Sequence, residues 1–134
     1  MKNKKIDLSD LIGKPFKYYG RGPRAFDCYG LIKEVLNRAG YELPDKKTFI
    51  EMRLRNDALQ KGREYVVELS KPEPYCIVAF RVEGPLVGHV GVVLEDINKF
   101  IHIQTKKRCC IEKLDHPLWR SRIEGYYKVK ELIK

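Results

Sequence analysis

The chain has 134 residues, of which 43% are hydrophobic and 8 are tyrosines, which predicts one folded domain over residues 1–134. It has no apolar run near 18 residues, which excludes a membrane-spanning helix. Residues 1–5 are basic, but residues 6–10 lack the apolar core of a signal peptide. We therefore expect synthesis in the cytoplasm without a secretion signal.

The net charge of +9 has two interpretations. It describes either a solvated lysine-rich surface or a protein with an anionic partner, such as nucleic acid, a membrane surface or an acidic cell-wall polymer. Charge alone does not choose among these. Nucleic acid is the weakest of them, because the aromatic residues do not alternate with the basic clusters as a base-stacking surface requires.

The four cysteines are Cys28, Cys76, Cys109 and Cys110. Their spacing matches no zinc motif, so we expect no metal and no cofactor. A disulfide framework is not expected without a secretion signal. We place Cys76 and one of the neighbouring pair in the core, and expect the other of the pair to be exposed or to face an edge.

The predicted elements place helices before strands. In chain order they are a short helix or turn over 6–12, helices over 28–39 and 48–60, strands over 65–69, 75–81, 89–95, 99–104 and 109–112, irregular structure or one helical turn over 118–122, and a last strand over 126–130. In the first element, Leu8, Leu11 and Ile12 are expected to face inward. This order predicts an α+β fold with an antiparallel sheet.

Cys28 stands where a glycine-rich stretch becomes a helix. Gly20-Arg21-Gly22-Pro23 precedes it, apolar residues then recur at helical spacing, and Gly40 is a natural stop. Unpaired backbone N–H groups in the first turn favour an anion, which predicts a lowered pKa for the Cys28 thiol. The alternative is a buried structural cysteine.

Two histidines could serve such a thiol. His89 opens a strand, and Gly91 on the same face suggests that another group approaches closely there. His102 lies on the next strand, where it could orient His89. Counting from the turn displaces His102 along the strand by about three residues, or about 10 Å. Gln104 is then the better placed orienting residue, and both stay candidates. His116, in a polar loop, is expected to be an ordinary surface residue.

Four segments carry a resemblance that covers roughly residues 11–130. They are Gly13-Lys14-Pro15-Phe16, Phe26-Asp27-Cys28-Tyr29-Gly30-Leu31, Gly88-His89-Val90-Gly91-Val92 and Phe100-Ile101-His102. In this order and at these intervals they resemble the NlpC superfamily of cell-wall cysteine peptidases, which have papain-like α+β folds. The Tyr41-Glu42-Leu43-Pro44 segment and the stretch from Trp119 to Tyr127 look most like the phage-tail branch of that family.

The resemblance implies Cys28 as nucleophile, His89 as base and His102 as the orienting third member. It implies hydrolysis, without metal, of the amide between γ-D-glutamate and a diamino acid in peptidoglycan stem peptides. It also implies action at the cell wall, with phage tail-tip proteins as possible partners. We expect Asp27, Tyr18, Tyr19 and Gln104 to support the site.

One departure from the family bears on the activity. The family often has a tyrosine where this chain has Phe16, and its hydroxyl is thought to reach the active site. Tyr18 or Tyr19 could replace it. The departure motivates an alternative, a catalytically weak structural component of a phage tail. A third interpretation is a thiol acyltransferase on the same fold, although no apolar acyl-binding stretch is visible.

Overall fold

The computed structural model describes residues 6–43, 66–82, 84 and 87–130. Its elements are η1 (Ser9–Leu11), α1 (Cys28–Arg38), β1 (Val66–Leu69), β2 (Ile77–Arg81), β3 (Val87–Val93), β4 (Lys99–His102), β5 (Cys110–Lys113), α4 (Pro117–Arg120) and β6 (Ile123–Val129). The helix predicted over 48–60 lies outside the described residues. The α+β prediction is confirmed.

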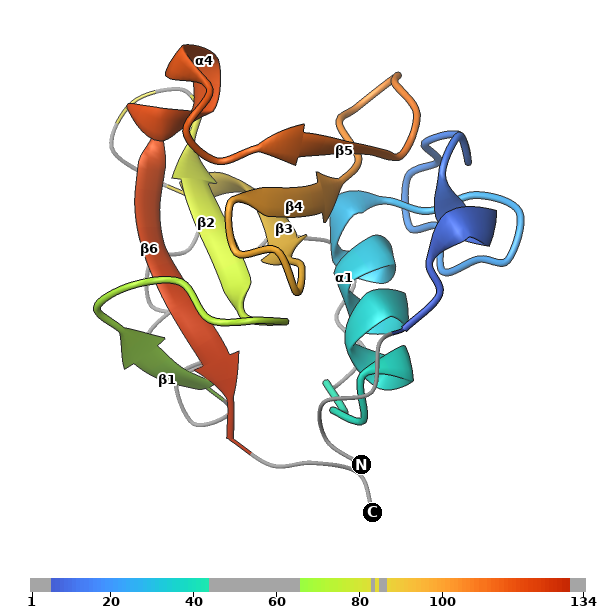
Figure 1. Cartoon of the computed structure of the whole chain (residues 1–134). Helices are drawn as coiled ribbons and strands as arrows, with labels where there is room; N and C mark the ends of the chain where they lie inside the picture. Colours follow the sequence, from blue (N-terminus) through green and yellow to red (C-terminus); the bar gives the residue numbers. More distant parts are fainter. Residues whose placement is uncertain (1–5, 44–65, 83, 85–86, 131–134) are drawn as a thin grey trace.

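The six described strands form one antiparallel sheet in the order β1-β6-β2-β3-β4-β5. Figure 1 shows α1 beside β3 and β4, with the η1 segment on the outer side of the helix. β6 begins three residues before the predicted 126–130 and lies inside the sheet between β1 and β2. Its position there depends on pairing with strands distant in sequence, which local periodicity does not encode.

α1 forms where it was predicted, because its ends carry strong signals. The Asp27 side chain accepts a hydrogen bond from Gly30 N at 2.6 Å and so caps the first turn. Gly40 follows the last turn with φ +96°, a conformation that glycine adopts without steric cost. The apolar stripe between these ends turns inward, as expected. Its buried members are Tyr29, Leu31, Ile32, Val35 and Leu36.

The sheet separates two apolar clusters. One lies between the sheet and α1, where helix residues pack on Ile77, Ala79, Val90, Val92, Ile101 and Ile103. The other covers the opposite face and contains Cys76, Val78, Phe80, Val93, Phe100, Leu114 and Trp119. Both faces are buried because each strand alternates its side chains between them.

Smaller predictions had mixed outcomes. Leu8 and Leu11 are buried as expected, but Ile12 is 45% exposed, because the short 3₁₀ turn ends before it. Cys76 and Cys109 are buried and Cys110 is half-buried, as predicted. No helix within the described ranges has the length and apolar character to cross a membrane.

Candidate active site

A tight loop delivers Cys28 to the first residue of α1. Phe26 N donates to Pro15 O, Lys17 N donates to Phe26 O, and Asp27 N donates to Gly20 O. A Cβ on Gly30 would overlap the Gly20 carbonyl, and a Cβ on Gly20 would lie 2.8 Å from Lys17 O. Both glycines are therefore needed for the loop to pack against the start of the helix.

Asp27, expected to support the site, holds this turn in place. Its Oδ1 accepts both Gly30 N and an Arg21 guanidinium N–H, the latter at 2.9 Å, and the side chain is 5% exposed. Its Oδ2 is buried and has no hydrogen-bond partner among the residues that the structure describes. The carboxylate thus links the Arg21 side chain of the preceding loop to the backbone of the first turn after Cys28.

The pKa of the Cys28 thiol is higher than its position at the start of a helix predicts. Burial raises its pKa to about 12, and the Asp27 carboxylate adds to the rise. The backbone N–H groups of Val90, Tyr29 and Cys28 lower it, but by less. The expected lowering was wrong, because desolvation of this half-buried residue's thiolate raises the pKa by more than the backbone N–H groups lower it.

His89 and His102 meet, although they lie on different strands. His89 Nε2 is 2.8 Å from His102 Nδ1, and the side chains are 5% and 0% exposed. Val92 pairs with Ile101 and Val93 with Phe100, so His102 faces Gly91, two residues from His89 on the same side of the sheet. The predicted three-residue displacement was one residue too long.

Gly91 makes this meeting possible. A Cβ there would lie 2.9 Å from Ile101 O, 2.9 Å from a Phe100 ring carbon and 3.2 Å from His102 Cβ. The close approach expected on this face is therefore made by His102 and Phe100. The hydrogen-bond partner of His89 Nε2 is therefore His102, and not the alternative Gln104.

The series of side-chain hydrogen bonds continues beyond His102 to two residues that the sequence did not lead us to assign to the site. His102 Nε2 is 2.9 Å from Glu112 Oε2, and Trp119 Nε1 donates to Glu112 Oε1 at 2.9 Å. Trp119 is 1% exposed, and its ring lies 5.8 Å from that of His89 and 5.0 Å from that of His102, centroid to centroid. We call the sequence His89–His102–Glu112–Trp119 the relay.

Charges along the relay follow from burial and contacts. Burial lowers the pKa of His89 to about 3, with His102 contributing. Burial also lowers the pKa of His102, despite the opposing Glu112. Partial burial would raise the pKa of Glu112, but the hydrogen bonds from Trp119 and His102 outweigh it and lower the pKa. At neutral pH the relay therefore holds two neutral imidazoles and one carboxylate.

The nucleophile and the relay adjoin at β3. A hydrogen bond from the Val90 backbone N–H lowers the pKa of the Cys28 thiol, and Val90 directly follows His89. Within the described part of the chain, no hydrogen bond joins the Cys28 sulfur to an imidazole. His89 and His102 are thus in direct contact, and Cys28 lies against the backbone of Val90, the residue after His89.

The remaining candidates lie further out. Tyr18 and Tyr19 are 51% and 59% exposed, and the Tyr18 ring packs edge-on against Phe16 with centroids 5.0 Å apart. His116 is at the surface, as predicted, and its Nδ1 accepts Leu118 N at 3.0 Å to cap α4.

Solved structures share this fold. A protein of the NLP/P60 family from Staphylococcus aureus, described as similar to a lipoprotein, superposes with a TM-score of 0.63 at 22% identity over 96% of this chain and 44% of its own. The NlpC/p60 domain of the peptidoglycan hydrolase SagA superposes with a TM-score of 0.57 at 18% identity over 92% of both chains.

Sequence relatives point the same way. A probable endopeptidase p60 from Listeria grayi is 30% identical over 83 residues, which are 62% of this chain. This chain spans only 14% of the length of that relative. Residues 13–128 match the NlpC/P60 family, so most of the chain is covered. The chain belongs to the NlpC/P60 family.

Proposed function

We propose that the chain is a cysteine peptidase that hydrolyses amide bonds in peptidoglycan stem peptides. The observation that carries the proposal is the relay, a hydrogen-bonded series of two buried histidines, a half-buried Glu112 and a buried Trp119, which ends next to a helix-start cysteine. The family assignment supports it, as do the names of two similar proteins, the p60 endopeptidase and the peptidoglycan hydrolase SagA.

The relay gives His89 a defined tautomer. An ionised Glu112 only accepts hydrogen bonds, so neutral His102 must present its proton on Nε2. Nδ1 of His102 is then an acceptor, and His89 must donate from Nε2. This leaves Nδ1 of His89 unprotonated and able to act as a base. Glu112 thus sets the direction of both hydrogen bonds.

The reaction starts from a neutral thiol and a neutral imidazole. Nδ1 of His89 takes the Cys28 proton as the sulfur attacks the amide carbonyl, since such hydrogen bonds often tighten only when substrate is bound. Backbone N–H groups at the start of α1 stabilise the oxyanion. His89 then protonates the leaving amine, and water attacks the thioester with His89 again as base.

The family resemblance implies which bond is cleaved, and the charge of the chain favours a stem peptide as substrate. We propose cleavage between γ-D-glutamate and a diamino acid. Stem peptides are rich in carboxylates, and a chain with a net charge of +9 attracts them.

We further propose that the protein reaches the cell wall as part of a phage tail. The support is the sequence of Tyr41-Glu42-Leu43-Pro44 and of the stretch from Trp119 to Tyr127, which resembles the phage-tail branch. Tail-tip proteins would be its partners. Absence of the protein from purified virions of a phage or prophage that encodes it would refute this part of the proposal.

The enzymatic proposal is tested by incubating the chain with purified peptidoglycan and following the release of new amino groups and muropeptide fragments by mass spectrometry. We expect release by the unaltered chain and none by Cys28→Ala. His89→Asn should lose release, whereas His116→Asn, which alters an exposed histidine outside the relay, should retain it. Equal release by Cys28→Ala would overturn the mechanism.

A further inference from the structure

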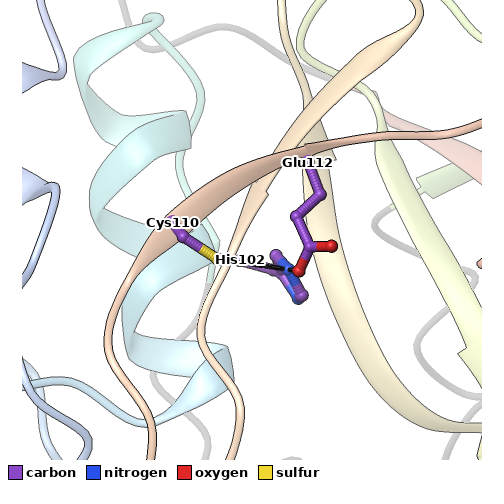
Figure 2. A group of neighbouring side chains, drawn as sticks. All are labelled: His102, Cys110 and Glu112. Carbon is purple, nitrogen blue, oxygen red and sulfur yellow. Dashed lines mark hydrogen bonds and ion pairs between the residues drawn. The ribbon is translucent and has the colours of Figure 1, made fainter. Parts of the chain in front are cut away.

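Three metal-ligating side chains meet at the outer end of the relay. The sulfur of Cys110 lies 3.7 Å from His102 Nε2 and 3.7 Å from Glu112 Oε2, and these last two atoms are 2.9 Å apart. Figure 2 shows Cys110 and Glu112 extending from β5 toward the same imidazole nitrogen. We call these three residues the outer cluster.

Strand pairing explains why the cluster forms. His102 on β4 pairs directly with Cys110 on β5, so the two side chains share one face of the sheet. Glu112 follows Cys110 by two residues and returns to the same face. Cys110 and Glu112 are half-buried while His102 is fully buried. An ion can therefore reach the cluster from solvent without opening the core.

The donor spacing suits tetrahedral zinc. Zinc bonds of about 2.0–2.1 Å to nitrogen, 2.3 Å to thiolate and 2.0–2.2 Å to carboxylate place the donors of a tetrahedral site about 3.3–3.6 Å apart. The two sulfur distances of 3.7 Å are close to this range, and the His102–Glu112 pair needs to widen by only a few tenths of an ångström. A thiolate and an imidazole favour zinc over magnesium or calcium.

We propose that His102 Nε2, Cys110 Sγ and Glu112 Oε2 bind one zinc ion, with water as the fourth ligand, and that this ion inhibits the peptidase. The inference rests on the proposed function for its inhibitory effect, but zinc binding itself does not. The spacing of the cysteines predicts no metal site, because the three ligands come together only through the pairing of β4 with β5.

Inhibition follows from the direction of the hydrogen bond between the two histidines. When zinc occupies His102 Nε2, a neutral His102 carries its proton on Nδ1 and donates to His89 Nε2. His89 must then carry its own proton on Nδ1, the atom that would accept the Cys28 proton. The zinc-bound relay thus holds the base in the wrong tautomer.

The protons balance without an added reactant. The Cys110 thiol releases one proton to solvent and binds zinc as thiolate. The His89 Nε2 proton moves to His102 Nδ1 along their hydrogen bond. His102 Nε2 loses its proton to solvent, and His89 Nδ1 takes up one proton from solvent, so these two exchanges cancel. Both imidazoles stay neutral, and one proton is released for each zinc ion bound.

Binding is measured first, by titrating the Cys28→Ala chain with zinc under reducing conditions in a calorimeter. This background removes the nucleophile as an alternative zinc ligand. We expect one zinc ion per chain, and an affinity at least about tenfold weaker when Cys110→Ala is added. His116→Asn, which removes an exposed histidine outside the cluster, should bind as tightly as the background. Equal affinity with and without Cys110 would overturn the site.

Inhibition is measured on chains that retain Cys28, as the ratio of peptidoglycan hydrolysis with and without zinc. Zinc should inhibit the unaltered chain, a chelator should restore it, and Cys110→Ala should resist. The imidazole ¹⁵N signals should move the His89 proton from Nε2 to Nδ1 when zinc binds. If zinc binds but neither inhibits hydrolysis nor moves the His89 proton, the proposed inhibition by a change of tautomer is wrong. No hydrolysis in zinc-free buffer would instead refute the proposed function and leave the binding result standing.

Discussion

The two halves of the candidate site are built in different ways. The nucleophile half is local, because the loop, the Asp27 cap and the start of α1 all lie between Pro15 and Leu31. The relay half draws on four elements, with one residue each from β3, β4, β5 and α4. A local unit can be recognised as a motif, whereas a relay spread over several elements exists only once the sheet has paired. Breaking each half should therefore have different signatures.

The largest effect is expected at the nucleophile. Cys28→Ala should reduce peptidoglycan hydrolysis by about 10⁴-fold or more, because no other group in the mechanism can form the thioester. The free energy of unfolding, measured by urea denaturation, should change little, since Cys28 contributes one small side chain to the core. A large loss of stability would mean that Cys28 is chiefly structural.

The next effect is expected at Gly91. An added Cβ would press on the backbone and side chains of β4, so Gly91→Ala should lower both stability, by about 1–3 kcal/mol, and hydrolysis. Gly125→Ala on β6 is the matched control, because its nearest neighbour is the Tyr127 hydroxyl at 3.2 Å, and it should keep its activity. Urea denaturation and hydrolysis rates check both variants. Full activity in Gly91→Ala would contradict the tight β3–β4 contact.

Glu112 tests the relay without removing either histidine. A carboxylate accepts from both His102 and Trp119, whereas a glutamine has a single oxygen for two donors. Glu112→Gln should lower kcat about tenfold or more with little change in KM, and ¹⁵N spectra should show mixed tautomers for His89. Unchanged spectra together with unchanged kcat would show that Glu112 does not direct the proton.

A smaller effect is expected at the helix cap. Asp27→Asn can keep the bond to Gly30 N but removes the charge that raises the pKa of the Cys28 thiol. The pH profile of iodoacetamide alkylation at Cys28 should therefore shift to lower pH. Asp27→Ala should in addition lose about 1 kcal/mol of stability with the cap. An alkylation profile at higher pH would contradict the assigned effect of Asp27.

The smallest effect lies outside both halves, at the pair that ties α1 to η1. The side-chain hydrogen bonds from Arg38 lower the pKa of Asp10 from 3.8 to about 2. A lowered folded-state pKa stabilises the fold above the unfolded value of 3.8, and this contribution is lost as pH falls toward 2. As the pH is lowered toward 2, the melting temperature of Asp10→Asn should fall less than that of the unaltered chain. Equal sensitivity would show that the pair contributes nothing.

Much of the fold and the core of the site could be predicted from sequence. α1, its cap and its glycine stop carry local signals, and Cys28, His89 and His102 stand in recognisable motifs. The orienting residue could not be decided, because register alone does not decide it: extending the observed pairing would place Gln104 opposite His89, but β4 ends at His102, whose ring reaches His89 diagonally across Gly91. Glu112 was missed for a related reason, since its role depends on which residues β5 places opposite β4.

The sequence by itself determined where the nucleophile sits, because an N-cap, two close-packing glycines and a helical apolar stripe all lie near Cys28 in the chain. Only the tertiary structure decided the ionisation of that thiol, since its pKa depends on burial and on the Asp27 carboxylate. It also decided that His102 meets His89, that Glu112 and Trp119 extend the relay, and that Cys110 joins His102 and Glu112. These contacts arise from strand register, a property of paired strands that no single segment contains.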